Sequence, residues 1–168
     1  CAAKDLGGAC STQFTLSLSN DNFQSKEYLM GSLQSNFLGS LFQLSNHVDP
    51  ASTTTITFTG GCRIVPAEVR HLEVNLTDPL DMGKSYKLLT EKPQYDYSRK
   101  TYTLNMHGCA KMSSVNNLKL KDTSSNKNAF LLGKEAENNY NVLLWHPLSP
   151  LVGFSIALSC LSFKLITM

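Results

Sequence analysis

The sequence predicts a mainly β domain in which antiparallel strands form a closed or nearly closed barrel around a hydrophobic C-terminal α-helix. Short segments of alternating apolar and polar residues recur as far as Pro147, and turn-forming segments separate them. The last stretch of the chain abandons this alternation for a nearly continuous apolar run. A sheet closed around that run would bury it and would leave no open edges.

Two strands are predicted to bury one face. The segments TQFTLSLS (12–19) and VRHLEVNLT (69–77) both alternate with a period of two. The inward residues are expected to be Phe14, Leu16 and Leu18 in the first segment, and Leu72, Val74 and Leu76 in the second.

Further strands are predicted over TTTITFTGG (53–61), KTYTLNMHG (100–108) and NNLKLKD (116–122). A fourth, YNVLLW (140–145), is expected to be buried on both faces. The segments NHVDPAS, TDPLDMGKS and DTSSNKN are rich in turn-forming residues and are predicted to connect strands.

The C-terminal helix is predicted to span Pro150–Phe163, with Ser149 as its N-cap. This length gives roughly 21 Å of helix, whereas a bilayer core is about 30 Å thick. Ser155, Ser159 and Ser162 lie on one face and can bond back to carbonyls of the helix itself. A helix that is apolar on all sides lies either in protein or in lipid. The length favours protein, and a membrane-anchored tail is the alternative.

Composition fits a single globular domain without a general affinity for nucleic acid. The chain has 168 residues, of which 42% are hydrophobic and 17% charged, and its formal net charge is +2. Ten of its fifteen Lys and Arg residues fall between Lys84 and Lys134, so one face could still be positive. The five cysteines are widely spaced without a CxxC pair, which indicates reduced, partly buried thiols in a cytosolic protein.

Catalytic and metal-binding motifs are missing from the sequence. The four histidines are scattered, no metal-ligand spacing occurs, and no nucleophile elbow or phosphate-binding loop is found. We therefore predict a non-enzymatic protein without a cofactor.

The final segment, GFSIALSCLSFKLITM, resembles the end of the tubby C-terminal domain family. Three other segments resemble the same family in the same order: YLMGSLQSNFLGSLFQL, YTLNMHGCAKMSSVNNLKL and LLGKEAENNY. The resemblance covers roughly residues 12–168 and implies a closed antiparallel barrel threaded by the C-terminal helix. Residues 1–11 are then an N-terminal flank. The family's first strands are expected to be missing or to precede Cys1, as in a piece of a longer protein.

Domains of this family bind phosphoinositide head groups through a lysine and an arginine in a K-L-R-S-N motif. The matching residues here are Ser32 and Gln34, so the resemblance implies that both charges are lost. A third basic contact of the family aligns with Cys62, and Arg63 follows it. Tight lipid binding through these positions is not expected.

A second basic face is predicted around the segment NNLKLKD. Lys119 and Lys121 would project from one side of a strand, opposite Leu118 and Leu120. Lys111 and Lys134 are candidate neighbours. These lysines would either attract anionic lipid weakly or form an ordinary solvated face.

The resemblance implies two roles. The first is a cytoplasmic adaptor that contacts phosphoinositide-containing membrane and serves protein trafficking of the ciliary kind. The second is a protein-interaction module, as in tubby-like ubiquitin ligase receptors, that has lost the phosphoinositide site. The substitutions at Ser32 and Gln34 favour the second role.

Overall fold

A computed structural model of the chain describes residues 2–6, 11–19, 23, 25, 27–59, 71–78 and 83–162. Within these ranges ten strands form one antiparallel sheet in the order β1-β2-β3-β4-β5-β6-β7-β10-β11-β12. The strands of this sheet are β1 (Ala2–Asp5), β2 (Gln13–Ser17), β3 (Leu29–Ser35), β4 (Leu41–Asn46), β5 (Thr53–Thr59), β6 (His71–Asp78), β7 (Lys84–Thr90), β10 (Leu118–Asp122), β11 (Asn128–Ala136) and β12 (Asn139–Leu144). A separate hairpin consists of β8 (Gln94–Asp96) and β9 (Thr101–Thr103), and the helix α1 spans Pro150–Ser162.

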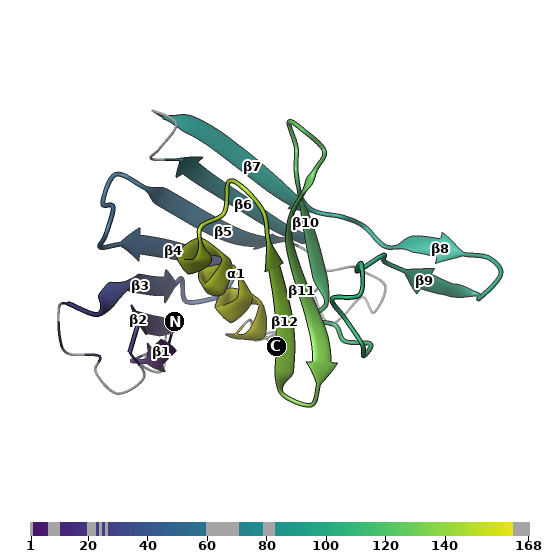
Figure 1. Ribbon diagram of the computed structural model, residues 1–168, viewed down its shortest axis with the longest axis horizontal. Coiled ribbons are helices and arrows are strands. Elements are labelled where there is room, and N and C mark those ends of the chain that lie inside the picture. Colours follow the sequence, from purple (N-terminus) through teal and green to yellow (C-terminus); the bar gives the residue numbers. More distant parts are fainter. Residues whose placement is uncertain are drawn as a thin grey trace.

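The sheet curls around the helix, with β4 and β5 on one side of α1 and β11 and β12 on the other (Figure 1). The prediction of a barrel threaded by the helix is therefore confirmed in its elements but not in its closure. The described residues of β1 and β12 form the two edges of the sheet and are not hydrogen-bonded to each other. β1 lies before the predicted domain boundary and pairs with β2, and where the domain begins stays a prediction.

The helix begins where the sequence predicts. The Ser149 hydroxyl accepts a hydrogen bond from the Val152 backbone N–H at 3.3 Å, which satisfies one of the open donors of the first turn. Ser155, Ser159 and Ser162 donate to the carbonyls of Leu151, Ile156 and Leu158 in the same helix. The serine stripe therefore needs no outside partner, and α1 can be buried without unsatisfied hydroxyls.

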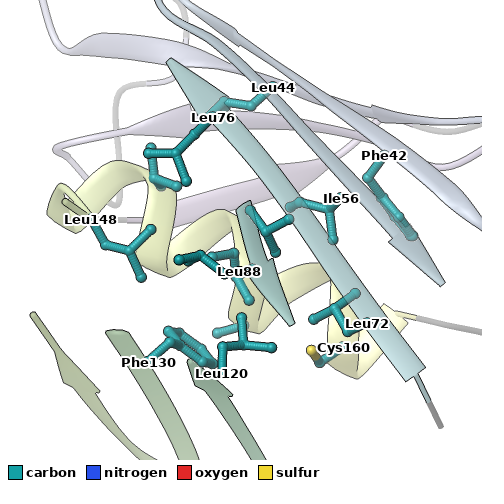
Figure 2. Packing of buried hydrophobic residues seen from close by; sticks show 14 of the residues in the cluster. Phe42, Leu44, Ile56, Leu72, Leu76, Leu88, Leu120, Phe130, Leu148 and Cys160 are labelled. Carbon is teal, nitrogen blue, oxygen red and sulfur yellow. The ribbon is translucent and has the colours of Figure 1, made fainter. Parts of the chain in front are cut away.

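Buried side chains from the helix and from both halves of the sheet form one core. Ile156 and Cys160 of α1 are almost completely buried between the sheet residues shown in Figure 2. Leu72 and Ile56 approach the helix from one half, and Phe130 approaches it from the other. No helix among the described residues is long and apolar enough to cross a membrane. The described part of the apolar tail is thus an element of the protein core.

Strands β5 and β6 follow the predicted alternation. Leu72, Val74 and Leu76 are buried, and they pair with Phe58, Ile56 and Thr54 of β5, which are buried as well. Gly60 and Gly61, at the end of the predicted segment TTTITFTGG, lie outside the described residues.

The predicted inward position of Leu18 is wrong. The register of β2 against β3 shifts between Leu16 and Ser17, which marks a β-bulge. An extra residue at a bulge reverses the alternation of faces beyond it. Ser17 is consequently buried, whereas 58% of Leu18 is exposed.

Two other strand predictions are wrong in part. The segment YNVLLW is not buried on both faces, because β12 is an edge strand and leaves Val142, Leu143 and Trp145 exposed. The segment KTYTLNMHG forms strand β9 over Thr101–Thr103 alone. It then turns, with positive φ at His107 and Gly108.

The described cysteines, Cys109 and Cys160, are buried. Cys109 donates from Sγ to the Asn141 carbonyl at 3.4 Å, and burial raises the pKa of its thiol. Cys1, Cys10 and Cys62 lie outside the described residues.

We expect Gly133→Ala to destabilise the fold more than Gly153→Ala. A Cβ at Gly133 in β11 would lie 2.6 Å from the backbone of Cys109, so a chain segment would have to move, at about 1–3 kcal/mol. A Cβ at Gly153 in α1 would meet only the tip of the Leu144 side chain, which can rotate. Alanine also favours helix over glycine by about 1 kcal/mol. Urea unfolding of both variants measures the difference, and an equal loss would contradict it.

Candidate functional site

The two positions that the sequence resemblance aligns with the family's lipid contacts, Ser32 and Gln34, lie on β3 and are uncharged. Ser32 is half-buried and Gln34 is exposed. Their cross-strand neighbours on β2 and β4 are neutral as well: Thr15, Ser45, Gln13 and Gln43. These direct neighbours offer hydroxyls and amides but no cation, and the exposed Lys4 of β1 lies one strand further along, where it pairs with Thr15. Several phosphates need more than one Lys or Arg within reach. Arg63 and Cys62 lie outside the described residues.

Lys119 and Lys121 both project toward Glu91, which follows β7. Lys119 Nζ lies 2.7 Å from Glu91 Oε2, and Lys121 Nζ lies 2.9 Å from Oε1. Only 6% of the Lys119 side chain is exposed, and its ammonium also approaches the Asn105 carbonyl and His107 Nε2 at 3.4 Å. Lys119 and Lys121 do share one face of the strand, but both ammonium groups are paired with the Glu91 carboxylate. This face is neither an open basic face nor an ordinary solvated one.

The Glu91 carboxylate is stabilised in its charged form. Burial by itself raises the pKa of Glu91, but the hydrogen bonds and charges of Lys119 and Lys121 outweigh burial and hold the pKa below its ordinary value. The two lysines therefore balance a partly buried carboxylate near neutral pH.

Lys111 and Lys134 do not join this cluster through any ion pair among the described residues. Lys111 pairs with Glu135, at the end of β11. Lys134 is half-buried, and its backbone N–H donates to Asn117 Oδ1 at 2.8 Å. Three of the four lysines predicted to form a basic face are thus bound to carboxylates.

A cavity of 620 Å³ near the start of β7 gathers cationic side chains that the sequence analysis did not bring together. It is lined by Lys84, Lys127, His146 and Trp145, among others. Lys84 Nζ lies 5.0 Å from the centre of the Tyr86 ring, and the rings of Tyr86 and His146 meet edge to face at 5.7 Å. These residues come from three distant segments, so spacing along the chain gave no signal of the cavity.

Asp122, at the end of β10, also lines the cavity. Its carboxylate accepts hydrogen bonds from the hydroxyls and backbone N–H groups of Ser124 and Ser125 at 2.6–3.2 Å. Burial by itself raises the pKa of Asp122, but these four donors outweigh burial and lower the pKa to about 2. Asp122 is therefore ionised near neutral pH, and its carboxylate fixes the turn before β11.

A second feature that the sequence analysis missed is an exposed aromatic cluster on hairpin β8–β9. Tyr95 pairs across the hairpin with Tyr102, and their ring centroids lie 5.2 Å apart. Tyr95 also meets Tyr97 at 5.1 Å, edge to face. The exposed fractions are 42% for Tyr95, 86% for Tyr97 and 68% for Tyr102. The hairpin extends away from the large sheet (Figure 1). The sequence signal was the close spacing of three tyrosines around a polar turn.

The described residues contain no group of three or more His, Cys, Asp or Glu side chains arranged to hold a metal ion. Comparison with family models adds the deciding observation: the Tub family model matches residues 61–163, which is more than half of the chain. The chain belongs to the Tub family. A comparison with curated proteins finds no match. In this Tub-family domain the sheet and the helix of the family are present, whereas the charges expected on β3 are not.

We expect Glu91→Gln to destabilise this Tub-family domain by about 3 kcal/mol, because it leaves the buried Lys119 ammonium without its counter-charge. The matched control is Glu135→Gln, which breaks the more exposed pair with Lys111 and should cost less than about 1 kcal/mol. Denaturant unfolding at neutral pH compares the two. Equal losses of unfolding free energy in the two variants would show that the pairing of Glu91 with Lys119 and Lys121 contributes no more than an exposed ion pair.

Asp122 should give the fold an acid-sensitive contribution. Because its pKa falls from 3.8 to about 2 on folding, the contribution is present above pH about 4 and is lost as the pH falls toward 2. We expect Asp122→Asn to lose about 2 kcal/mol at pH 7. Its unfolding free energy should converge with that of wild type at low pH. A constant difference across the pH range would contradict the assignment.

Proposed function

We propose that this Tub-family domain is a non-enzymatic adaptor module that binds a protein partner and does not use β3 as a phosphoinositide site. One observation carries the proposal: Ser32 and Gln34 are uncharged, and their direct cross-strand neighbours on β2 and β4 are uncharged as well. The predicted basic face does not replace the lost charges, because Lys119 and Lys121 are held by Glu91.

The expected loss of membrane affinity supports a protein partner over a lipid site on β3. Each Lys or Arg near an anionic membrane contributes about 1 kcal/mol. Losing the two charges of β3 therefore lowers affinity by roughly 30-fold before any loss of specific head-group contacts. A domain that was selected for lipid affinity would keep these charges.

A non-enzymatic role is supported by the surroundings of the histidines. His107 lies against the Lys119 ammonium, and His146 meets the Tyr86 ring edge to face. Neither arrangement is a nucleophile activated by a base and oriented by a third group.

A second candidate function is association with phosphoinositide-containing membrane, as in the cytoplasmic trafficking adaptors, including ciliary ones, that the family resemblance implies. The cavity near Lys84, Lys127 and His146 favours it, since its cations lie together at one end of the sheet. In this case the lipid contact would lie far along the sheet from β3 (Figure 1).

Liposome flotation tests the choice. Two kinds of vesicle with equal negative charge are compared: phosphatidylcholine with phosphoinositide, and phosphatidylcholine with phosphatidylserine. We expect the wild-type chain to bind the first kind no better than the second. We expect Ser32→Lys with Gln34→Arg to raise phosphoinositide binding by about tenfold or more, because it restores two cations on β3.

Selective, tight wild-type binding to phosphoinositide would instead support the second candidate. The double variant Lys84→Ala with Lys127→Ala locates such binding, because it removes two cations of the cavity and leaves β3 unchanged. The pair Lys111→Ala with Lys134→Ala serves as its control for loss of charge alone.

A further inference from the structure

We propose that hairpin β8–β9 is the docking surface for a partner protein that presents an acidic groove or segment. This inference rests on the proposed protein-interaction function and names its surface and the chemistry of its partner. The hairpin is a projecting arm that contacts itself far more than any other element (Figure 1).

Exposure of the three tyrosine rings on the hairpin to water is unfavourable, and the cluster is well suited to binding a partner. Three tyrosine rings are exposed and hold one another edge to face. Tyr gives a large, rigid contact area that loses little conformational freedom on binding, and it is enriched in the residues that dominate interface energies. None of the three rings belongs to the large hydrophobic core.

The turn between the strands holds the cluster in place before any partner arrives. Asp96 Oδ1 accepts from the Ser98 backbone and hydroxyl at 2.8 and 2.6 Å and from the Arg99 backbone at 3.2 Å. An isolated two-stranded hairpin is marginal in water, so these local bonds and the ring contacts keep it formed. A preformed surface has less entropy to lose on association.

The charged residues of the hairpin indicate the chemistry of its partner. The arm carries Lys92, Arg99 and Lys100, all exposed, and the single acidic residue Asp96 is occupied by its own turn and by Arg99 at 3.7 Å. A positive rim around an aromatic centre complements a negative surface. Like charges disfavour a second copy of the same hairpin as the partner. The carboxylate of Asp96 disfavours insertion into a bilayer core. Shallow contact with an anionic membrane surface, which tyrosines also suit, is an outcome of the test below.

Panning of a random peptide display library against the full chain tests the proposal. We expect the recovered peptides to be enriched in Asp and Glu, and their affinity, measured by fluorescence anisotropy, to fall as salt rises. Tyr97→Ala with Tyr102→Ala should weaken binding at least about tenfold, and Arg99→Glu with Lys100→Glu should abolish it. Phe37→Ala, which removes a side chain that is 73% exposed in the β3–β4 turn, should leave binding unchanged.

Each variant is first compared with wild type by circular dichroism and thermal unfolding, which should match because the hairpin lies outside the core. Recovery of peptides without acidic enrichment overturns the proposal. Acidic peptides that bind the hairpin variants as tightly as wild type overturn it too, although a protein-interaction function then survives at another surface. Concentration-dependent dimers or anionic-vesicle binding that depends on Tyr97 would show that the occupant is a second copy or lipid instead.

Discussion

The burial of α1 is the constraint on which the rest of the structure depends. The helix carries no charged residue, and eight of its side-chain positions are buried. The hydroxyls of Ser155, Ser159 and Ser162 donate to carbonyls of the helix itself, so these groups do not need contact with solvent. The apolar surface of such a helix favours any arrangement that covers it on all sides. The sheet provides that cover by curling, and the inward residues of both of its halves meet on the helix. Closure by hydrogen bonds between β1 and β12 is not needed, because the helix itself fills the space between the sheet's two halves.

The same constraint shapes the electrostatics. Strand β10 must bury Leu118 and Leu120 against the core, and this places Lys119 where its ammonium is nearly buried. A buried cation without a counter-charge is strongly unfavourable, so Glu91 is drawn into the fold as its partner. Lysines that seem available for a ligand in the sequence are therefore part of the scaffold. Among the other described cations, Lys84 and Lys127 line the cavity near the start of β7, and Arg99 and Lys100 lie on the projecting hairpin.

Sequence reasoning succeeded where the structure depends on local periodicity and failed where it depends on partners distant in the chain. The N-cap at Ser149 and the inward faces of β5 and β6 follow from residues within a few positions of each other. The bulge at Leu16 depends on the pairing with β3, and the exposure of Val142 depends on β12 having no strand beyond it. The pairing of Lys119 with Glu91 likewise joins two strands whose adjacency no spacing reveals. The family resemblance pointed to Ser32 and Gln34 as positions of lost charge, which stays a prediction, and it indicated neither the cavity nor the hairpin β8–β9.

The position of hairpin β8–β9 separates its surface from the core of the domain. Residues on β3 alternate between the core and the surface, so a change there acts next to buried neighbours such as Leu33. The hairpin is instead held by its own turn and by contacts between its own rings. Substitutions on it leave the burial of α1 intact, since none of its side chains enters the core. A surface that can change without a loss of stability is where new specificity is least constrained.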